Sequence, residues 1–357
     1  MKCTSPLFRV QPWLIEFAKG RDFPLTLKRK LHNKEYPIIG YLEACDYMKR
    51  YALPEQAFQE IPCGQCLNCR LNHSKEWAVR CMLEDKYSSD SYFVTLTYDD
   101  LHVPYKNVII EENGLFMPFQ ELRKKDLQDF FKRLRKALFG NKKGNLRYFA
   151  CGEYGDKTYR PHFHCILFNL PLSDLKLYKC RHSSNGDILY FNSAFLSKIW
   201  GKGFVVVSAV SENTCAYTAR YALKKVDFTH SVEEAKSNLA DMELQMNFGK
   251  FFDYVVSAEY LQKPFCVMSR RPGLGRDYFD ENCGIIYQYD EIPGMSLRKL
   301  KYYDRLYDEL SDFTHRELNE IKEKRARIAQ AKTPYFADKF EEIKQRKVQS
   351  RIKRDKI

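Results

Sequence analysis

The sequence predicts an α+β fold in which helices flank a central antiparallel sheet. Four stretches are rich in β-branched and aromatic residues, as strands are, and turn-forming residues bound them. An amphipathic pattern of helical period lies between the first two. The second and third are joined by a short segment with Gly155 and Asp156, which favours an antiparallel pair. The predicted strands are 91–98, 147–154, 161–168 and 203–210.

The predicted helices follow from apolar residues at helical spacing. The clearest is 119–139, which has an apolar stripe, basic residues largely off that stripe, and Gly140 after its end. Further patterns predict helices at 70–87, 195–200, 213–225, 226–262 and from 296 onward. Residues 1–60 predict only an irregular or short-stranded segment. The predicted domains are 1–88 with a cysteine cluster, 89–228 as the α+β core, and 229–357 as a helical, basic region.

The 357 residues carry a net charge of +13, and 15% of them are aromatic. This composition favours a polyanionic partner such as nucleic acid, although such a charge can also merely keep a protein from associating. No uncharged apolar run reaches about 18 residues, so we expect no membrane span. The first residues lack the apolar core of a signal peptide, so we expect no export. The basic tail 344–357 would add non-specific affinity for DNA.

Three of the 12 cysteines form two overlapping C-x-x-C steps, at Cys63, Cys66 and Cys69. Without a secretory signal, a disulfide framework is not expected. The spacing instead allows the thiolates to converge on one structural zinc ion. The alternative is three reduced cysteines near the start of a helix. A zinc site needs a fourth ligand, for which the candidates are Cys3, His73 and Cys81.

Two histidines, His162 and His164, flank Phe163 in the third predicted strand. Side chains alternate along a strand, so the histidines share one face and Phe163 takes the other. Two imidazoles on one face can hold a divalent cation. Glu153, near the end of the preceding strand, can lie beside His162 and complete a site suited to Mg²⁺ or Mn²⁺, or to Zn²⁺. The alternative is ordinary histidines and an exposed acid.

The predicted helix 213–225 carries Tyr217 and Tyr221 one turn apart, with Lys224 on the same face. Two phenols and an ammonium group would therefore be presented together. A packing face with a lysine that reaches solvent is the alternative interpretation.

The segment 264–276 is rich in glycine and proline and contains Arg270 and Arg271. Close approach of its backbone, together with the guanidinium groups, would suit DNA phosphates. An ordinary surface turn is the alternative.

A strand with the sequence FVTLT, then His-Phe-His, then Tyr-x-x-x-Tyr-x-x-Lys resembles the HUH endonuclease family of rolling-circle replication initiators over roughly residues 91–225. The tandem tyrosines resemble its two-tyrosine branch, found in small isometric single-stranded DNA phages. Flanking motifs are similar to those of gokushovirus-type microviruses and extend the resemblance over most of 1–280. These motifs are CGQCLNCR at 63–70, EWAVRC at 76–81 and MSRRPG at 268–273.

The resemblance implies an HUH fold, which is a five-stranded antiparallel sheet with helices on one side, and the fifth strand is expected within 103–117. An insertion at 171–200 separates the histidines from the tyrosines. The implied partners are the single-stranded or supercoiled viral DNA origin and the host helicase and DNA polymerase. The implied location is the cytoplasm of the host bacterium.

The implied activity is nicking and religation of the viral origin. His162, His164 and Glu153 would bind Mg²⁺ or Mn²⁺, and Lys224 would favour ionisation of a tyrosine. Tyr217 or Tyr221 would attack and form a 5′-phosphotyrosine with a free 3′-OH. The other tyrosine would cleave the regenerated origin, and the released 3′-OH would close a circle.

Two other functions remain open from the sequence. A conjugative relaxase or HUH transposase would use the same residues on another DNA substrate. A non-catalytic origin-binding protein would hold the histidines in its core, and it would bind DNA without metal and without a covalent adduct.

Overall fold

A computed structural model of the chain describes residues 3, 6–10, 14, 28–31, 34–54, 57–64, 66–110, 115–142, 144–155, 160–182, 187–221, 261–295 and 299–331. The chain forms two compact units, Met1–His73 with Ser311–Ile357, and Ser74–Leu310. The predicted helix 226–262 lies outside the described residues except at its last positions, and the tail 344–357 lies outside them entirely.

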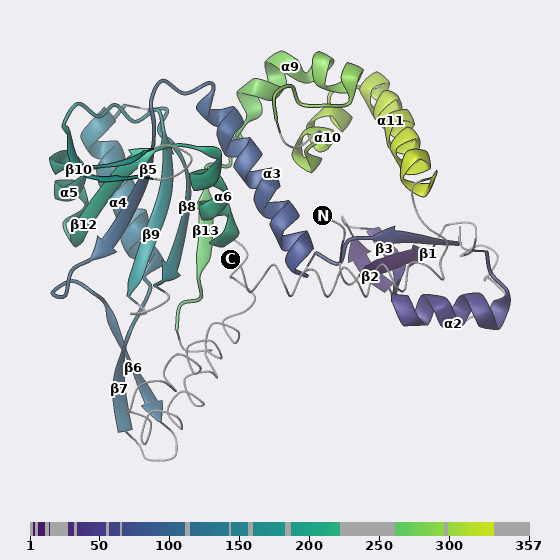
Figure 1. Ribbon diagram of the computed structural model, residues 1–357, viewed down its shortest axis with the longest axis horizontal. Coiled ribbons are helices and arrows are strands. Elements are labelled where there is room, and N and C mark those ends of the chain that lie inside the picture. Colours follow the sequence, from purple (N-terminus) through teal and green to yellow (C-terminus); the bar gives the residue numbers. More distant parts are fainter. Residues whose placement is uncertain are drawn as a thin grey trace. The chain divides into compact units, whose positions relative to one another are not determined.

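The second unit is built on a seven-stranded antiparallel sheet (Figure 1). The four strands predicted from the sequence are its centre, and the 91–98, 147–154 and 161–168 bounds are confirmed. In spatial order, the strands are β10 (Leu175–Arg181), β11 (Ile188–Ser193), β12 (Gly203–Ala209), β5 (Ser91–Tyr98), β9 (Pro161–Phe168), β8 (Arg147–Tyr154) and β13 (Phe265–Met268).

The expected count of five strands was wrong, and so was the place of the missing strand. Residues 103–117 contribute to β6 (Tyr105–Ile110) and β7 (Leu115–Gln120), which pair with each other as a separate two-stranded sheet. The additional strands of the main sheet are β10, β11 and β13. Their residues looked like a polar insertion and a loop because strands near the edge of a sheet are less buried and lack a continuous apolar pattern.

Helices cover both faces of this sheet rather than one. On one face, α4 (Lys124–Phe139) and α5 (Ala194–Trp200) enclose a core that includes Val94, Phe163 and Val205. On the other, α3 (Leu67–Asp85) and α6 (Glu212–Tyr221) pack on Phe149, Ile166 and Phe168. We call these the α4 face and the α6 face.

Helix α4 confirms the apolar stripe predicted for it but begins later than expected. Leu127, Phe130, Phe131 and Leu134 are buried in the core. The predicted start at residue 119 was wrong because 115–120 form hydrogen bonds as strand β7 instead.

A buried carboxylate joins α3, β8 and the segment before α9 (Arg276–Tyr289). Glu84 is 3% exposed, pairs with the guanidinium of Arg147, and accepts a hydrogen bond of 2.7 Å from the backbone N–H of Gly275. Arg147 also donates to the carbonyl of Pro272 at 3.0 Å. Helix α10 (Lys301–Asp308) adds Tyr303, whose hydroxyl donates to the carbonyl of Gly275 at 2.7 Å.

We expect Glu84→Ala to lower the free energy of unfolding by about 3 kcal/mol, because it leaves a largely buried guanidinium and an N–H without their acceptor. Urea denaturation followed by circular dichroism measures this change. The control is Asp280→Ala, which removes an exposed ion pair with Arg276 and should change it by less than about 1 kcal/mol. A similarly small loss for Glu84→Ala would contradict this account.

The first unit contains a four-stranded antiparallel sheet where only irregular structure was predicted. Its strands, in spatial order, are β2 (Lys28–Leu31), β3 (Lys34–Gly40), β1 (Leu7–Val10) and β4 (Phe58–Ile61). Helix α2 (Tyr41–Tyr51) packs on this sheet through a small core with Phe8, Val10, Ile39 and Ala44. The strands are short, so sequence alternation is a weak signal for them.

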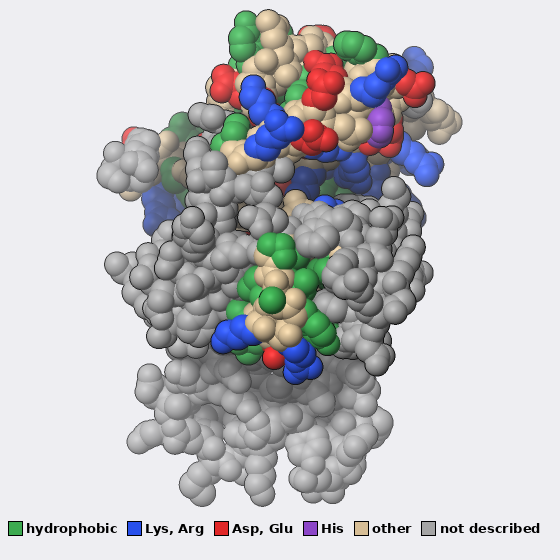
Figure 2. Space-filling view, turned by 90° about the vertical axis from the view of Figure 1, so that its right-hand side faces the viewer, with side chains coloured by type: hydrophobic (Ala, Val, Ile, Leu, Met, Phe, Trp, Pro, Cys, Tyr) green, Lys and Arg blue, Asp and Glu red, His purple; other side chains and the backbone are tan. Residues whose placement is uncertain are grey.

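Helix α11 (Asp312–Ala331) belongs to the same unit. Basic and acidic side chains are mixed along it, as the upper part of Figure 2 shows. Its described surface is therefore not a basic stripe for DNA. Among the described residues, no helix is both long and apolar enough to span a bilayer.

Candidate functional site

The pairing of β8 with β9 brings the three predicted metal ligands together on the α6 face. Glu153 lies directly opposite His162, and His164 follows two residues later on the same face. Phe163 points to the other face, into the core beneath α4. The alternation predicted from the sequence is thus confirmed, and the short β8–β9 connection fixes the register that places Glu153.

Both histidines converge on one carboxylate oxygen. The Nε2 atoms of His162 and His164 lie 2.9 and 3.0 Å from Oε1 of Glu153. Glu153 and His164 are buried, and His162 is partly exposed. One ligand atom from each residue lies within 4.8 Å of the other two. The three donors form a small cluster that opens toward solvent on the side of His162.

The second nitrogen of each imidazole is also held. Nδ1 of His162 lies 3.1 Å from the carbonyl oxygen of Arg160, which can only accept, so Nδ1 carries a proton. In a neutral ring Nε2 is then an acceptor, yet it faces the acceptor Oε1. Such a pair requires a proton or a cation between the two atoms. Nδ1 of His164 lies 3.1 Å from the hydroxyl of Thr95. Bonds of this type orient histidines that ligate metals.

Glu153 is held in its charged form. Burial opposes ionisation, but the hydrogen bonds and positive charge offered by His162 and His164 outweigh it, so the pKa of Glu153 lies below its usual value. A carboxylate with two imidazoles is a donor set that fits Mg²⁺, Mn²⁺ or Zn²⁺.

Helix α6 places Tyr217 beside this cluster. Ser211 caps the helix, since its hydroxyl accepts a hydrogen bond of 3.2 Å from the N–H of Thr214. Cys215 and Ala219 are fully buried against the sheet and α3. The Tyr217 ring therefore meets the His164 ring edge to face, with 5.1 Å between their centroids.

Other predicted residues are not all brought to this cluster. Tyr221 is the last residue of α6, one turn beyond Tyr217, and its side chain lies outside the described part. Lys224 also lies outside the described residues. Arg270 and Arg271 are exposed on the loop after β13. That loop bonds to Tyr148 at the start of β8, roughly 17 Å along the strand from Glu153.

Two residues of the site were not singled out from the sequence. Thr95 lies opposite His164 on β5, and Phe93 stacks on the His164 ring with 5.5 Å between centroids. Both belong to the FVTLT strand, but their partners depend on the register between β5 and β9. That register cannot be read from the strand itself.

We expect Thr95→Val to weaken Mn²⁺ binding about 10- to 100-fold, because His164 loses the group that orients it. Titration of the purified protein with Mn²⁺, followed by electron paramagnetic resonance, measures this affinity. Thr97→Val is the matched control, since Thr97 lies opposite His162, whose Nδ1 is bonded to a backbone carbonyl instead. Equal affinities in the two variants would contradict the assigned role of Thr95.

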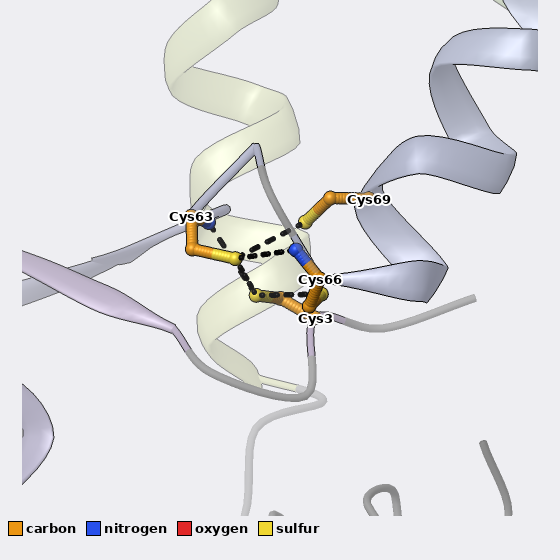
Figure 3. Close-up of side chains that lie close together, drawn as sticks. All are labelled: Cys3, Cys63, Cys66 and Cys69. Atoms are coloured by element: carbon orange, nitrogen blue, oxygen red, sulfur yellow. Dashed lines mark hydrogen bonds between the residues drawn. The ribbon is translucent and has the colours of Figure 1, made fainter. Parts of the chain in front are cut away.

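The cysteine cluster forms a second group of candidate ligands (Figure 3). The sulfur atoms of Cys3, Cys63, Cys66 and Cys69 lie within 4.8 Å of one another. Cys3 thus completes the set, rather than His73 or Cys81. Cys81 is instead buried on α3 in the core beneath α6. None of the four clustered cysteines forms a disulfide bond.

The spacing of the four sulfur atoms suits zinc. The Sγ atom of Cys3 lies 3.4 Å from that of Cys63 and 3.6 Å from that of Cys66, and Cys63 and Cys69 are 4.0 Å apart. Tetrahedral bonds of about 2.3 Å to zinc separate sulfur atoms by about 3.8 Å. Burial raises the pKa of the Cys69 thiol to about 11, so ionisation of Cys69 calls for a nearby cation.

Comparison with known proteins agrees with this site. The family model for replication-associated protein ORF2 matches residues 91–226, which span β5 to α6 and contain the histidines and Tyr217. No solved structure matches the chain.

Curated relatives extend the similarity beyond this region. Replication-associated protein ORF2 of Spiroplasma virus 4 is 32% identical over 309 residues, which cover 84% of this chain and 82% of that protein. Replication-associated protein VP4 of Bdellovibrio phage phiMH2K is 28% identical over 275 residues, covering 75% and 83%. Replication-associated protein ORF4 of Chlamydia phage 1 is 25% identical over 240 residues, covering 65% and 54%. The chain therefore belongs to the family of microvirus replication-associated proteins.

Proposed function

We propose that this protein is a replication initiator that nicks and religates single-stranded DNA at the viral origin through a tyrosine nucleophile. The observation that carries the proposal is the contact of Tyr217 with His164, one of three convergent ligands that include a carboxylate. A phenol, a partly open cluster of metal ligands and a basic protein together suit phosphoryl transfer.

The residues of the cluster have separate roles in this proposal. His162, His164 and Glu153 would hold Mg²⁺ or Mn²⁺, whose chemistry when bound is to polarise the scissile phosphate. The Tyr217 oxygen attacks the phosphorus atom and loses its proton to solvent. The bond to the 3′ oxygen breaks, and that oxygen takes up a proton. Since the phosphate remains esterified, later ligation needs no nucleotide cofactor.

Tyr221 would supply the second nucleophile, and Lys224 would favour ionisation of a phenol, whose ordinary pKa is about 10. The freed 3′-OH would prime the host polymerase, with a host helicase opening the duplex, in the bacterial cytoplasm. When Tyr221 cleaves the regenerated origin, the new 3′-OH would attack the phosphotyrosine and close the circle. Arg270 and Arg271 would contact DNA at the other end of β8.

The four cysteines would hold one structural zinc ion. The residues fit this ion because four sulfur donors converge from separate places in the sequence. The metal would tie Cys3 to the start of α3, and it would stabilise the fold without taking part in the reaction.

A denaturing gel with labelled single-stranded origin DNA and Mn²⁺ tests the proposed function. We expect a protein–DNA adduct that survives denaturation, fails to form with a chelator, and is absent in the Tyr217→Phe/Tyr221→Phe double variant. The matched control is Tyr289→Phe, which changes an exposed tyrosine on α9 and should leave the adduct unchanged. Tight DNA binding without any adduct would favour the non-catalytic origin-binding protein instead.

A further inference from the structure

An exposed aromatic side chain lies in the same transverse row of the sheet as the candidate metal ligands. Phe204 on β12 pairs with Thr97 on β5, and Thr97 pairs with His162 on β9. Residues opposite one another across antiparallel strands share a face, so Phe204 lies on the α6 face. Its neighbours Val205 and Val207 point into the core beneath α4, which confirms this orientation.

Phe204 is close to the site and open to solvent. Two strand spacings separate it from His162, which is roughly 10 Å. The side chain is 65% exposed, whereas Val205 is 4% exposed. A single exposed aromatic residue is common on protein surfaces. Its position beside the cluster gains meaning from the residues on the neighbouring strands.

Strands β10 and β11 place three cations on the same face. Tyr190 pairs with Ser208 of β12 and with Lys179 of β10, so all three lie on the α6 face. A β-bulge between Leu177 and Lys179 changes the alternation along β10. As a result, the exposed residues Lys176, Lys179 and Arg181 all pair with α6-face residues of β11, namely Asn192, Tyr190 and Ile188.

We propose that β10, β11 and β12 form a platform for single-stranded DNA that leads to the candidate active site. Phe204 stacks on a base near the scissile phosphate, and the three cations of β10 contact backbone phosphates. Aromatic residues beside a basic groove are how proteins bind single strands without reading base edges. This inference rests on the proposed function for the identity of its ligand, and it assigns the direction from which the strand arrives.

Fluorescence anisotropy with a labelled single-stranded origin oligonucleotide, without metal, tests the stacking role. We expect Phe204→Ala to bind about tenfold more weakly, and Phe204→Tyr to stay within about twofold of wild type. The matched control is Phe313→Ala on α11, where the phenylalanine is 71% exposed, and it should bind as wild type does. Equal binding by Phe204→Ala and wild type would overturn the role of Phe204.

The salt dependence of binding tests the three cations separately. Each phosphate contact to a single strand contributes about 0.7 to the slope of log affinity against log salt. Replacing Lys176, Lys179 and Arg181 together by Gln should therefore reduce that slope by about 2. A triple replacement on the opposite side of the sheet, of Lys132, Lys136 and Lys142, should leave it unchanged. An unchanged slope in the first variant would overturn the platform.

These outcomes separate the inference from the proposed function. If wild type forms the covalent adduct but the Phe204 and β10 variants bind normally, the platform is wrong and the proposed activity stands. If wild type forms no adduct but these variants bind weakly, the platform stands and the nicking activity is wrong.

Discussion

Replacing His164 by Ala is expected to slow formation of the covalent DNA adduct about a thousandfold. The substitution removes one of three convergent donors and leaves Glu153 with one imidazole partner in a buried position. Loss of the charge stabilisation that depends on these donors should cost about 4 kcal/mol in the transition state. Single-turnover rates on a denaturing gel, at saturating oligonucleotide and varied Mn²⁺, measure the effect.

A matched variant separates loss of a ligand from loss of a histidine elsewhere. His315→Ala on α11 removes a histidine that hydrogen-bonds Asn319, and it should react at the wild-type rate. His162→Ala, at a more exposed ligand, provides a second test if His164→Ala fails to fold. A rate within about threefold of wild type for folded His164→Ala or His162→Ala would show that these histidines do not hold a catalytic metal.

Replacing Cys66 by Ser is expected to remove zinc from the protein and to destabilise its first unit. Bound zinc should fall from about one ion per chain to near zero by mass spectrometry, since the tetrahedral site loses a ligand. Zinc binding by four cysteines contributes directly to folding, so the unfolding temperature of this unit should fall by more than about 10 °C. Tryptic cleavage within the first 73 residues should become faster.

Cys45→Ser is the control for this prediction. Cys45 lies on α2 in the same unit but outside the cluster, so zinc content and unfolding temperature should stay close to wild type. A wild-type protein that contains no zinc after purification in zinc-supplemented medium would contradict the assignment. So would a Cys66→Ser variant that retains the ion.

The central strands could be predicted because their environment leaves a strong local pattern. Strands β5, β8 and β9 are covered on both faces, so β-branched and aromatic residues run almost without interruption. The outer hairpin of β10 and β11 has many exposed polar residues, and the bulge in β10 interrupts its alternation. The short strand β13 resembled a loop because it has only four residues beside a Gly/Pro segment. Its pairing with β8 is a long-range contact that no local pattern encodes.

The candidate site divides in the same way. Alternation alone placed both histidines on one face, and the short β8–β9 turn placed Glu153 opposite His162. Cys3 was one of three candidates because a partner 60 residues away cannot be chosen by spacing. The contact of Tyr217 with His164 could be expected only through the family resemblance. The position of α6 on the sheet depends on buried residues, such as Cys215 and Ala219, whose partners come from α3 and β9.

Identification of the residue that carries the DNA tests the central claim most directly. The wild-type adduct formed on origin DNA with Mn²⁺ would be digested with trypsin and nuclease and analysed by tandem mass spectrometry. We predict a nucleotide joined through a phosphate to Tyr217, or to Tyr221 in the same helix. A nucleotide on any other residue, or no modified peptide from a reaction that cleaves the DNA, would contradict the tyrosine mechanism.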